Sequence, residues 1–263
     1  MKEPERDVAN FRPTERFTSK AREYALFRPH YPASLILLLR ERAGLRPGMV
    51  VADIGSGTGI LTAQLLDEGA SVYAVEPNEA MRRKAEEDLG TNWRFHSVAA
   101  RAEATTLPSG STELVTIAQA FHWFDLPPTR VEFLRILKPE GHLCLVWNSR
   151  DPVGGEFEAG YNGLVEECCP AAKKTKDLGP TEEEIARFYG GEFLHTFLPN
   201  HQDLDREGLK GRFMSASYAP DSHEPSYVRA MSGLEKLFYE HVENGTVRLH
   251  YRTEVYLGRL SRD

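Results

Sequence analysis

Three glycines at alternate positions are the clearest chemical signal in the chain. Gly55, Gly57 and Gly59 follow an apolar run that ends in Asp53, and a helical pattern begins directly after them. Glycine tolerates positive φ and lets a ligand approach the backbone closely. The following helix presents unpaired N–H groups to whatever lies over the turn. The stretch therefore predicts a ligand-binding turn between a strand and a helix.

A second acid stands at the end of the next apolar run. Glu76 lies where a carboxylate can accept hydrogen bonds from the 2′ and 3′ hydroxyls of a ribose. The glycine spacing is G-x-G-x-G, and Ile60 stands where the dinucleotide pattern G-x-G-x-x-G has its third glycine. No Gly-Lys-Ser/Thr sequence follows, which disfavours a P-loop. The pattern favours a nucleoside ligand without an essential pyrophosphate.

The elements that must hold these residues alternate along the first half of the chain. Apolar runs predict strands over residues 49–53, 71–76, 93–98, 113–118 and 142–147. Helical patterns cover residues 35–43, 58–68, 79–89 and 127–137. Continuous apolar strands that alternate with helices are typical of a parallel sheet covered on both faces. Right-handed crossovers then give a doubly wound α/β fold.

The second half of the chain departs from this alternation. We interpret the region near residues 150–190 as an insertion or helical connection, which ends with a capping box at Thr181 and Glu184. Beyond it we expect a strand over 193–198, helices over 203–213 and 226–242, and an alternating strand over 246–258. The alternation breaks at Thr253. The overall prediction is a mostly parallel seven-stranded sheet with an antiparallel C-terminal edge strand and helices on both faces. This domain covers residues 34–263 and follows an aromatic-bearing N-terminal lid segment over residues 1–33.

The composition narrows the classes of partner. The chain of 263 residues is acidic, with 32 Lys and Arg against 39 Asp and Glu, so we expect no nucleic-acid partner. Three cysteines without ligand-like spacing predict free thiols and no metal site. The N-terminus has no apolar signal segment, and the apolar run over 35–39 is too short to cross a bilayer. We therefore expect a cytoplasmic protein that does not bind membranes.

Several segments together resemble one enzyme family. Residues 53–59 resemble the first motif of the class I S-adenosylmethionine-dependent methyltransferases, and Glu76 resembles their ribose-binding acid. Residues 137–142 are similar to the turn before the fifth strand of that family. A narrower resemblance, to small-molecule methyltransferases of the trans-aconitate methyltransferase type, rests on residues 17–24, 28–32 and 119–125.

The resemblance implies S-adenosylmethionine as cofactor and gives roles to individual residues. Asp53 is expected to bond the cofactor's amino group, and the backbone of Ala102 and Glu103 to contact its adenine. Gln119 joins this set because it ends the fourth strand, and ligands lie beyond the carboxyl ends of parallel strands. The expected cofactor-binding residues are Tyr24, Arg28, Asp53, Gly55, Gly57, Gly59, Glu76, Ala102, Glu103 and Gln119. The expected substrate-binding residues are Tyr31, His122 and Trp123.

Methyl transfer from a sulfonium is an in-line SN2 displacement that needs alignment and exclusion of water. The expected acceptor is a small molecule with a carboxylate or hydroxyl oxygen. His122 is the candidate general base, since an unperturbed histidine has a pKa of about 6.5, although a carboxylate acceptor would need no base. Two other functions remain open: a regulatory protein that binds S-adenosylmethionine without turnover, and an oxidoreductase, which the glycine spacing disfavours. We expect a monomer or weak homodimer.

Overall fold

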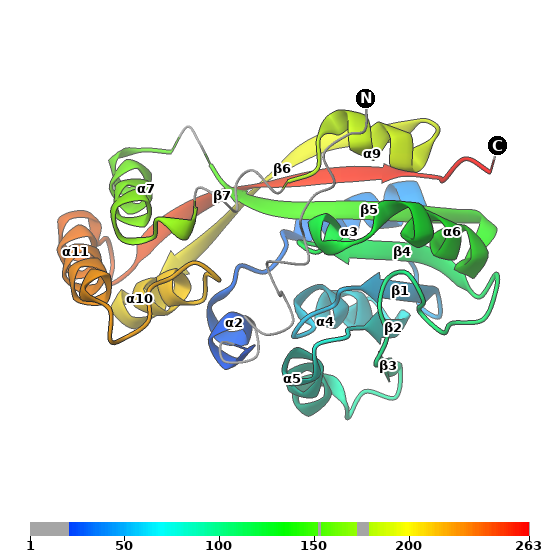
Figure 1. Ribbon diagram of the computed structural model, residues 1–263, viewed down its shortest axis with the longest axis horizontal. Helices are drawn as coiled ribbons and strands as arrows, with labels where there is room; N and C mark the ends of the chain where they lie inside the picture. The colour runs from blue at the N-terminus through cyan, green and yellow to red at the C-terminus, as the bar shows by residue number, and fades with distance from the viewer. Residues whose placement is uncertain (1–20, 152–153, 173–178, 263) are drawn as a thin grey trace.

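The computed structural model describes residues 21–151, 154–172 and 179–262, which form a twisted seven-stranded sheet with helices around it (Figure 1). The strand order is β3-β2-β1-β4-β5-β7-β6. The strands are β1 (Val50–Ile54), β2 (Ser71–Val75), β3 (Phe95–Val98), β4 (Thr112–Ala118), β5 (Leu137–Arg150), β6 (Phe193–Leu204) and β7 (Val247–Gly258). The first five strands pair in parallel, and β7 is antiparallel to both β5 and β6. The predicted mostly parallel sheet is confirmed.

Helices cover both faces of this sheet. They are α2 (Ala21–Phe27), α3 (Ala33–Ala43), α4 (Ile60–Asp67), α5 (Glu79–Leu89), α6 (Leu126–Ile136), α7 (Glu156–Cys168), α9 (Glu182–Tyr189), α10 (Arg206–Met214) and α11 (Pro225–His241). Successive residues of a strand point to opposite faces. Val51 accordingly packs with apolar residues of α3 and α4, whereas Ala52 and Ile54 pack with those of α6 and α9. This two-sided burial explains why the strands are continuous apolar runs.

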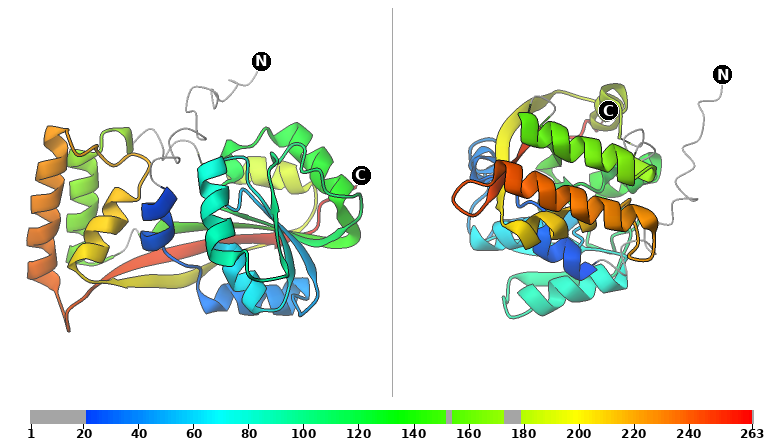
Figure 2. Two further views of the ribbon diagram at one scale, coloured as in Figure 1. Left: turned by 90° about the horizontal axis from the view of Figure 1, so that it is seen from below. Right: turned by 90° about the vertical axis from the view of Figure 1, so that its left-hand side faces the viewer.

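A smaller lobe forms at the far ends of the last two strands. β6 and β7 extend beyond the rest of the sheet, where α7, α10 and α11 pack around them (Figures 1 and 2). Apolar residues of the three helices form a cluster of their own with Leu249 and Tyr251 of β7. Helix α2 lies between this lobe and the main sheet, in contact with α10 and α5 (Figure 2). The region near 150–190 thus contributes α7 to the lobe and α9 to the main sheet.

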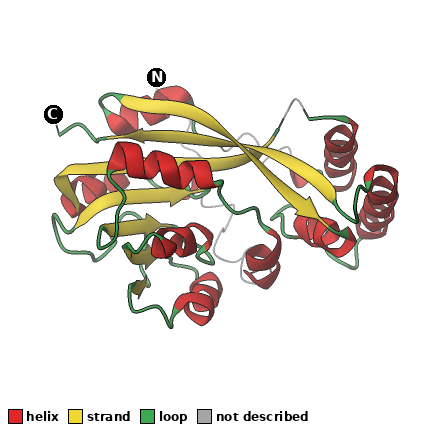
Figure 3. Ribbon diagram, turned by 180° about the vertical axis from the view of Figure 1, so that it is seen from behind, coloured by secondary structure: helices red, strands yellow, loops and turns green. Residues whose placement is uncertain are grey.

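The C-terminal strand is antiparallel as predicted, but its place in the sheet needs correction. β7 lies between β5 and β6, so β6 is the edge strand (Figure 3). The prediction missed this because β6 extends to Leu204 and pairs with β7 along its whole length. Residues 251–258 of β7 also pair with β5. Thr253 is buried on the same face as Tyr251 and Val255, and this position tolerates a polar residue because its hydroxyl donates a hydrogen bond to Oδ1 of Asn148.

Side chains cap the first turn of α5 and of α9. The side chain of Asn78 accepts a hydrogen bond from the backbone of Met81 at the start of α5. Thr181 and Glu184 form the predicted capping box at the start of α9. Residues 1–20 of the predicted lid lie outside the described residues, and its remainder forms α2 and the turn into α3. None of the described helices has the length and apolar character needed to cross a membrane.

Candidate active site

The glycine turn connects β1 to α4 through three residues with positive φ. The φ angles are 67° at Gly55, 58° at Gly57 and 85° at Gly59. A Cβ on Gly55 would lie 2.5 Å from the Cβ of Ala120, and one on Gly59 would lie 2.7 Å from Cδ1 of Leu89. A Cβ on Gly57 would meet no atom within 4 Å. Close packing therefore requires glycine at position 55, the Leu89 side chain would have to shift for a Cβ at position 59, and Gly57 faces open space.

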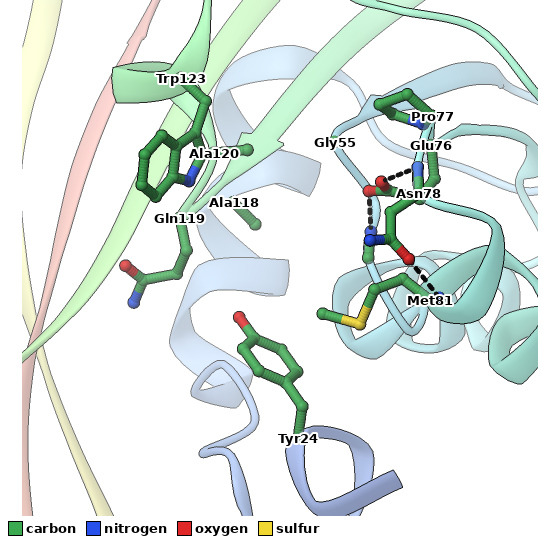
Figure 4. Close-up of a pocket in the computed structure, with 11 residues that line it drawn as sticks. Tyr24, Gly55, Glu76, Pro77, Asn78, Met81, Ala118, Gln119, Ala120 and Trp123 are labelled. Atoms are coloured by element: carbon green, nitrogen blue, oxygen red, sulfur yellow. Dashed lines mark hydrogen bonds between the residues drawn. The ribbon is translucent and has the colours of Figure 1, made fainter. Parts of the chain in front are cut away.

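Glu76 follows β2 and holds the glycine turn from the side (Figure 4). Its Oε2 accepts a hydrogen bond from the N–H of Gly57 at 2.9 Å, and its Oε1 accepts one from the N–H of Asn78 at 2.7 Å. Burial raises the pKa of the Glu76 carboxyl, and these two backbone hydrogen bonds oppose the rise. Each carboxylate oxygen keeps a further lone pair for another donor. Glu76 can therefore accept hydrogen bonds from ligand hydroxyls.

The turn and Glu76 form one wall of a pocket of about 610 Å³, a volume that includes its open mouth. The lining residues are Tyr24, Gly55, Gly57, Glu76, Pro77, Asn78, Met81, Ala118, Gln119, Ala120 and Trp123. Figure 4 shows Glu76 and Met81 on one side, Gln119 and Trp123 on the other, and Tyr24 reaching in from α2. The carboxyl ends of β1, β2 and β4 thus meet at the pocket, where α/β sheets bind ligands.

Gln119 has an unusual backbone conformation for a residue that is not glycine. Its φ is 62°, in the left-handed region. Its backbone N–H donates to the carbonyl of Val146 at 2.9 Å, and its side-chain Nε2 donates to the carbonyl of Asn148 at 3.0 Å. Such conformations cost energy and are concentrated at functional sites. The end of β4 therefore carries backbone strain within the pocket wall.

Asp53 lies behind the pocket wall. Its Oδ2 accepts a hydrogen bond from the hydroxyl of Thr62 at 2.6 Å, and its Oδ1 accepts one from that of Thr116 at 2.8 Å. Burial raises the pKa of the Asp53 carboxyl to about 6, although the threonine hydrogen bonds act against the rise. Asp53 is absent from the residues that line this pocket. Its carboxyl group ties β1, β4 and α4 together, and its cofactor contact stays a prediction.

Six of the twelve other predicted site residues line the pocket, namely Tyr24, Gly55, Gly57, Glu76, Gln119 and Trp123. The remaining six are Arg28, Tyr31, Gly59, Ala102, Glu103 and His122. Of these, His122 lies against a lining residue, because its ring centroid is 4.5 Å from that of Trp123. Gly59 is the residue before α4 and packs against α5.

The other four make contacts within the surrounding structure. Ala102 is buried in the core of the main sheet, and Glu103 accepts a hydrogen bond from the N–H of Asp125 at 3.1 Å. Tyr31 is buried against α3 and α4. Arg28 lies over the ring of Tyr24, with its guanidinium carbon 4.7 Å from the ring centroid. Their predicted ligand contacts remain predictions.

Sequence reasoning missed five lining residues: Pro77, Asn78, Met81, Ala118 and Ala120. Four of them adjoin a residue that was predicted, since they follow Glu76 or flank Gln119. Met81 lies one helical turn beyond Asn78, and the N-cap of α5 sets its direction. The predicted start of a helix soon after Glu76 could therefore have indicated Met81 as a lining residue.

The residues of the pocket fit a nucleoside such as S-adenosylmethionine. The hydroxyl oxygens of Ser56 and Thr58 are buried and have no hydrogen-bond partner in the described part of the chain. Buried polar groups are nearly always bonded, so these two hydroxyls beside Gly57, which do not themselves line the pocket, have hydrogen-bonding capacity to spare. Glu76 offers acceptors for ribose hydroxyls, and Met81 offers apolar surface. Within the described ranges, no group of three His, Cys, Asp or Glu residues could hold a metal ion.

Comparison with known proteins identifies the family. The methyltransferase domain family matches residues 52–145, from β1 into β5. An uncharacterized methyltransferase of Mycobacterium tuberculosis is 37% identical over 51% of this chain and 53% of that protein. The chain spans about half the length of the first curated relatives that it matches. A ubiquinone/menaquinone biosynthesis C-methyltransferase from Shewanella sediminis is 28% identical over 80% of this chain and 76% of that protein.

The fold has counterparts among solved structures as well. A structure from Anaeromyxobacter dehalogenans, provisionally assigned as a type II methyltransferase, has a TM-score of 0.66 and 23% identity over 89% of this chain and 98% of that chain. At this identity the likeness shows the fold alone. An uncharacterized methyltransferase of Schizosaccharomyces pombe is 30% identical over 72% of this chain and 80% of that protein. With this coverage and the glycine turn in place, the chain belongs to the S-adenosylmethionine-dependent methyltransferase family.

Proposed function

We propose that this protein transfers the methyl group of S-adenosylmethionine to an oxygen of a small-molecule acceptor. The observation that carries the proposal is the placement of the Glu76 carboxylate beside the open face of Gly57, in one pocket with Gln119 and Trp123. When bound, S-adenosylmethionine supplies an electrophilic methyl group on a sulfonium sulfur. The carbon–sulfur bond breaks as the new bond to the acceptor forms, and its electron pair stays on sulfur.

The wall formed by the glycine turn and α5 is the proposed cofactor side. Glu76 would hold the ribose hydroxyls, because both of its oxygens are fixed by backbone N–H groups and have lone pairs to spare. The hydroxyls of Ser56 and Thr58 would meet polar atoms of the cofactor beside Gly57. The adenine contact proposed for Ala102 and Glu103 would come from backbone atoms of their loop.

The opposite wall is the proposed acceptor side. Tyr24 and Trp123 present aromatic rings to the pocket, and aromatic faces stabilise neighbouring positive charge. His122 is the proposed general base for a hydroxyl acceptor, and its ring lies against that of Trp123, which lines the pocket. A carboxylate acceptor is already a nucleophile and would need no proton removal. A carboxylate or hydroxyl oxygen is therefore the favoured target.

The segment over residues 1–33 is the proposed lid, and its described part is tied down by several hydrogen bonds. The side chain of Gln64 accepts a hydrogen bond from the N–H of Tyr31 at 3.1 Å and donates one to its carbonyl at 2.8 Å. Asn200 donates a hydrogen bond to the carbonyl of His30 at 2.8 Å. These bonds hold the turn after α2 while Tyr24 faces the pocket. The lid would exclude water during transfer.

The remaining proposals concern the protein's surroundings. The net charge of −7 disfavours a phosphate backbone, so the acceptor is proposed to be a small molecule and not a nucleic acid. We propose a cytoplasmic location and a monomeric or weakly dimeric state. The resemblance to trans-aconitate methyltransferases supports an acidic acceptor.

Two measurements on the full chain test the proposal. Calorimetric titration with S-adenosylhomocysteine should show binding, and Glu87→Ala on the exposed face of α5 should not alter it. Transfer of a radiolabelled methyl group is then followed over a panel of carboxylic acids and phenols. Binding with no transfer to any acceptor in the panel would favour the regulatory alternative. Failure to bind the cofactor product at all would contradict the proposal.

A further inference from the structure

Three arginines from distant parts of the chain meet between the two lobes. Arg28 follows α2, Arg150 ends β5 and Arg212 lies in α10. Arg28 donates a hydrogen bond to the carbonyl of Ser215 at 3.1 Å, and Arg212 donates one to the hydroxyl of the same serine at 3.5 Å. Arg150 donates to the hydroxyl of Tyr218 at 3.0 Å. We refer to the three cations as the arginine cluster.

The partners of this cluster are neutral. Besides Tyr218, Arg150 donates from Nε to the side-chain oxygen of Asn162 at 2.7 Å. Arg212 donates from Nε to the hydroxyl of Tyr251 at 2.8 Å. Across the residues that the structure describes, no carboxylate forms an ion pair with any of the three arginines. Among the described residues, these three neighbouring cations thus have no counter-ion.

The cluster is substantially withdrawn from solvent. Arg212 is 4% exposed, and Nε of Arg28 is buried with no hydrogen-bond partner in the described residues. A guanidinium group remains charged, and a buried charge is costly unless it is paired. Burial would raise the pKa of the Tyr218 hydroxyl, but Arg150, Arg212 and Arg28 lower it overall. The hydroxyl therefore lies in the positive field of all three arginines.

The cluster adjoins the pocket through one side chain. The guanidinium of Arg28 lies over the ring of Tyr24, and Tyr24 lines the pocket. In Figure 4 the hydroxyl of Tyr24 points toward Gln119 and Trp123. Tyr24 therefore contacts both the pocket and one arginine of the cluster.

We propose that Arg28, Arg150, Arg212 and the Tyr218 hydroxyl form an anion site that holds the charged end of the methyl acceptor. The guanidinium fork matches the oxygens of carboxylate and phosphate groups. Three cations favour a small molecule with two or more negative charges. This inference rests on the proposed methyl transfer, but the binding of an anion to the site is measured without any transfer.

The test uses calorimetric titration of the full chain, first with S-adenosylhomocysteine and then with candidate anions. The anions are citrate, succinate and inorganic phosphate, and trimethyl citrate is the uncharged control. We expect the wild-type chain to bind at least one anion and not the triester. Arg150→Gln should weaken that binding by about tenfold or more, as expected for the loss of charged hydrogen bonds. Arg150→Lys keeps the positive charge but lacks the guanidinium fork. Its affinity for the anion should therefore lie between those of the wild-type chain and Arg150→Gln.

The matched control is Arg248→Gln, which removes the same charge from an exposed arginine of β7 that pairs with Asp203. It should bind the anion as the wild-type chain does. The anion site is overturned if no anion binds the wild-type chain, or if Arg150→Gln and Arg150→Lys bind as tightly as it does. Tighter binding of phosphate than of citrate would identify phosphate as the group held, and the reverse would identify carboxylate. If S-adenosylhomocysteine does not bind, the proposed function fails, whatever the anions do.

Discussion

The carboxylate of Glu76 accepts a hydrogen bond from the backbone N–H of Gly57 at 2.9 Å. This contact links the loop after β2 to the turn after β1. The second carboxylate oxygen is held by the N–H of Asn78. Backbone groups therefore set the position of the negative charge before any ligand binds, which reduces the entropy lost on binding.

Replacement of this acid by its amide should weaken cofactor binding. In Glu76→Gln the side-chain NH2 would face one of the two backbone N–H donors, so one hydrogen bond is lost and two donors oppose each other. We expect S-adenosylhomocysteine to bind about 10- to 100-fold more weakly, which corresponds to the roughly 1.5–3 kcal/mol of a charged hydrogen bond. Calorimetry measures the change, with Glu87→Gln as the exposed control. An unchanged affinity would remove Glu76 from the site.

Gly57→Ala should weaken cofactor binding while lowering the stability of the fold only slightly. A methyl group at this position would project into open space. The free energy of unfolding should therefore fall by only about 1–2 kcal/mol, the cost of the positive φ for alanine. The methyl group would occupy space proposed for the cofactor, so the affinity for the cofactor should fall. Gly48→Ala is the matched control, because Gly48 has a φ of 78° and equally open surroundings in an exposed turn. Both variants are unfolded in urea and titrated with S-adenosylhomocysteine. Equal cofactor affinities in the two variants would argue against a ligand at Gly57.

The strain at Gln119 predicts an order of stability between two variants. Both Gln119→Ala and Gln119→Gly lose the hydrogen bond to Asn148, but only glycine adopts the φ of 62° without a steric cost. The glycine variant should therefore be more stable than the alanine variant by about 1 kcal/mol. The free energy of unfolding in urea measures this difference. A more stable alanine variant would show that the backbone here is relaxed.

Asp53 predicts a pH dependence of stability. Its folded-state pKa of about 6 lies above its ordinary value, so the folded chain retains a proton that the unfolded chain releases between about pH 4 and pH 6. The free energy of unfolding should therefore fall as the pH rises through this window, by on the order of 3 kcal/mol from this group. Asp53→Asn cannot titrate, so its curve should lack this fall. The two proteins are compared by urea unfolding at pH 4.5 and pH 7.5, and parallel pH profiles would contradict the assignment.

The anchor of the lid segment can be tested without touching the pocket. Gln64→Ala removes both hydrogen bonds to the backbone of Tyr31, so amide hydrogens of residues 24–31 should exchange faster. Gln64→Glu keeps an acceptor for the Tyr31 N–H but has no donor for its carbonyl, and should show an intermediate rate. Hydrogen exchange followed by mass spectrometry gives these rates. The anchor is refuted if both variants exchange like the wild-type chain.

Much of the cofactor side could be predicted because its signals are local. The glycine residues themselves indicate positive φ angles. The alternation of strands and helices along the chain places Glu76 at the end of the next strand. The cap at Asn78 likewise depends on a few neighbouring residues. Asp53 shows what local signals leave open, because only the tertiary structure brings the hydroxyls of Thr62 and Thr116 to its two carboxylate oxygens.

By itself the sequence determined the glycine turn, the acid after the second strand and the order of strands and helices. Each of these features depends on backbone preferences and apolar periodicity over short stretches. Only the tertiary structure decided that β7 lies inside the sheet and that the arginine cluster exists. Arg28 and Ser215 are 187 residues apart, and their contact depends on how α2 packs against α10. No local pattern encodes such a contact, because it arises from the fit of two surfaces that form separately.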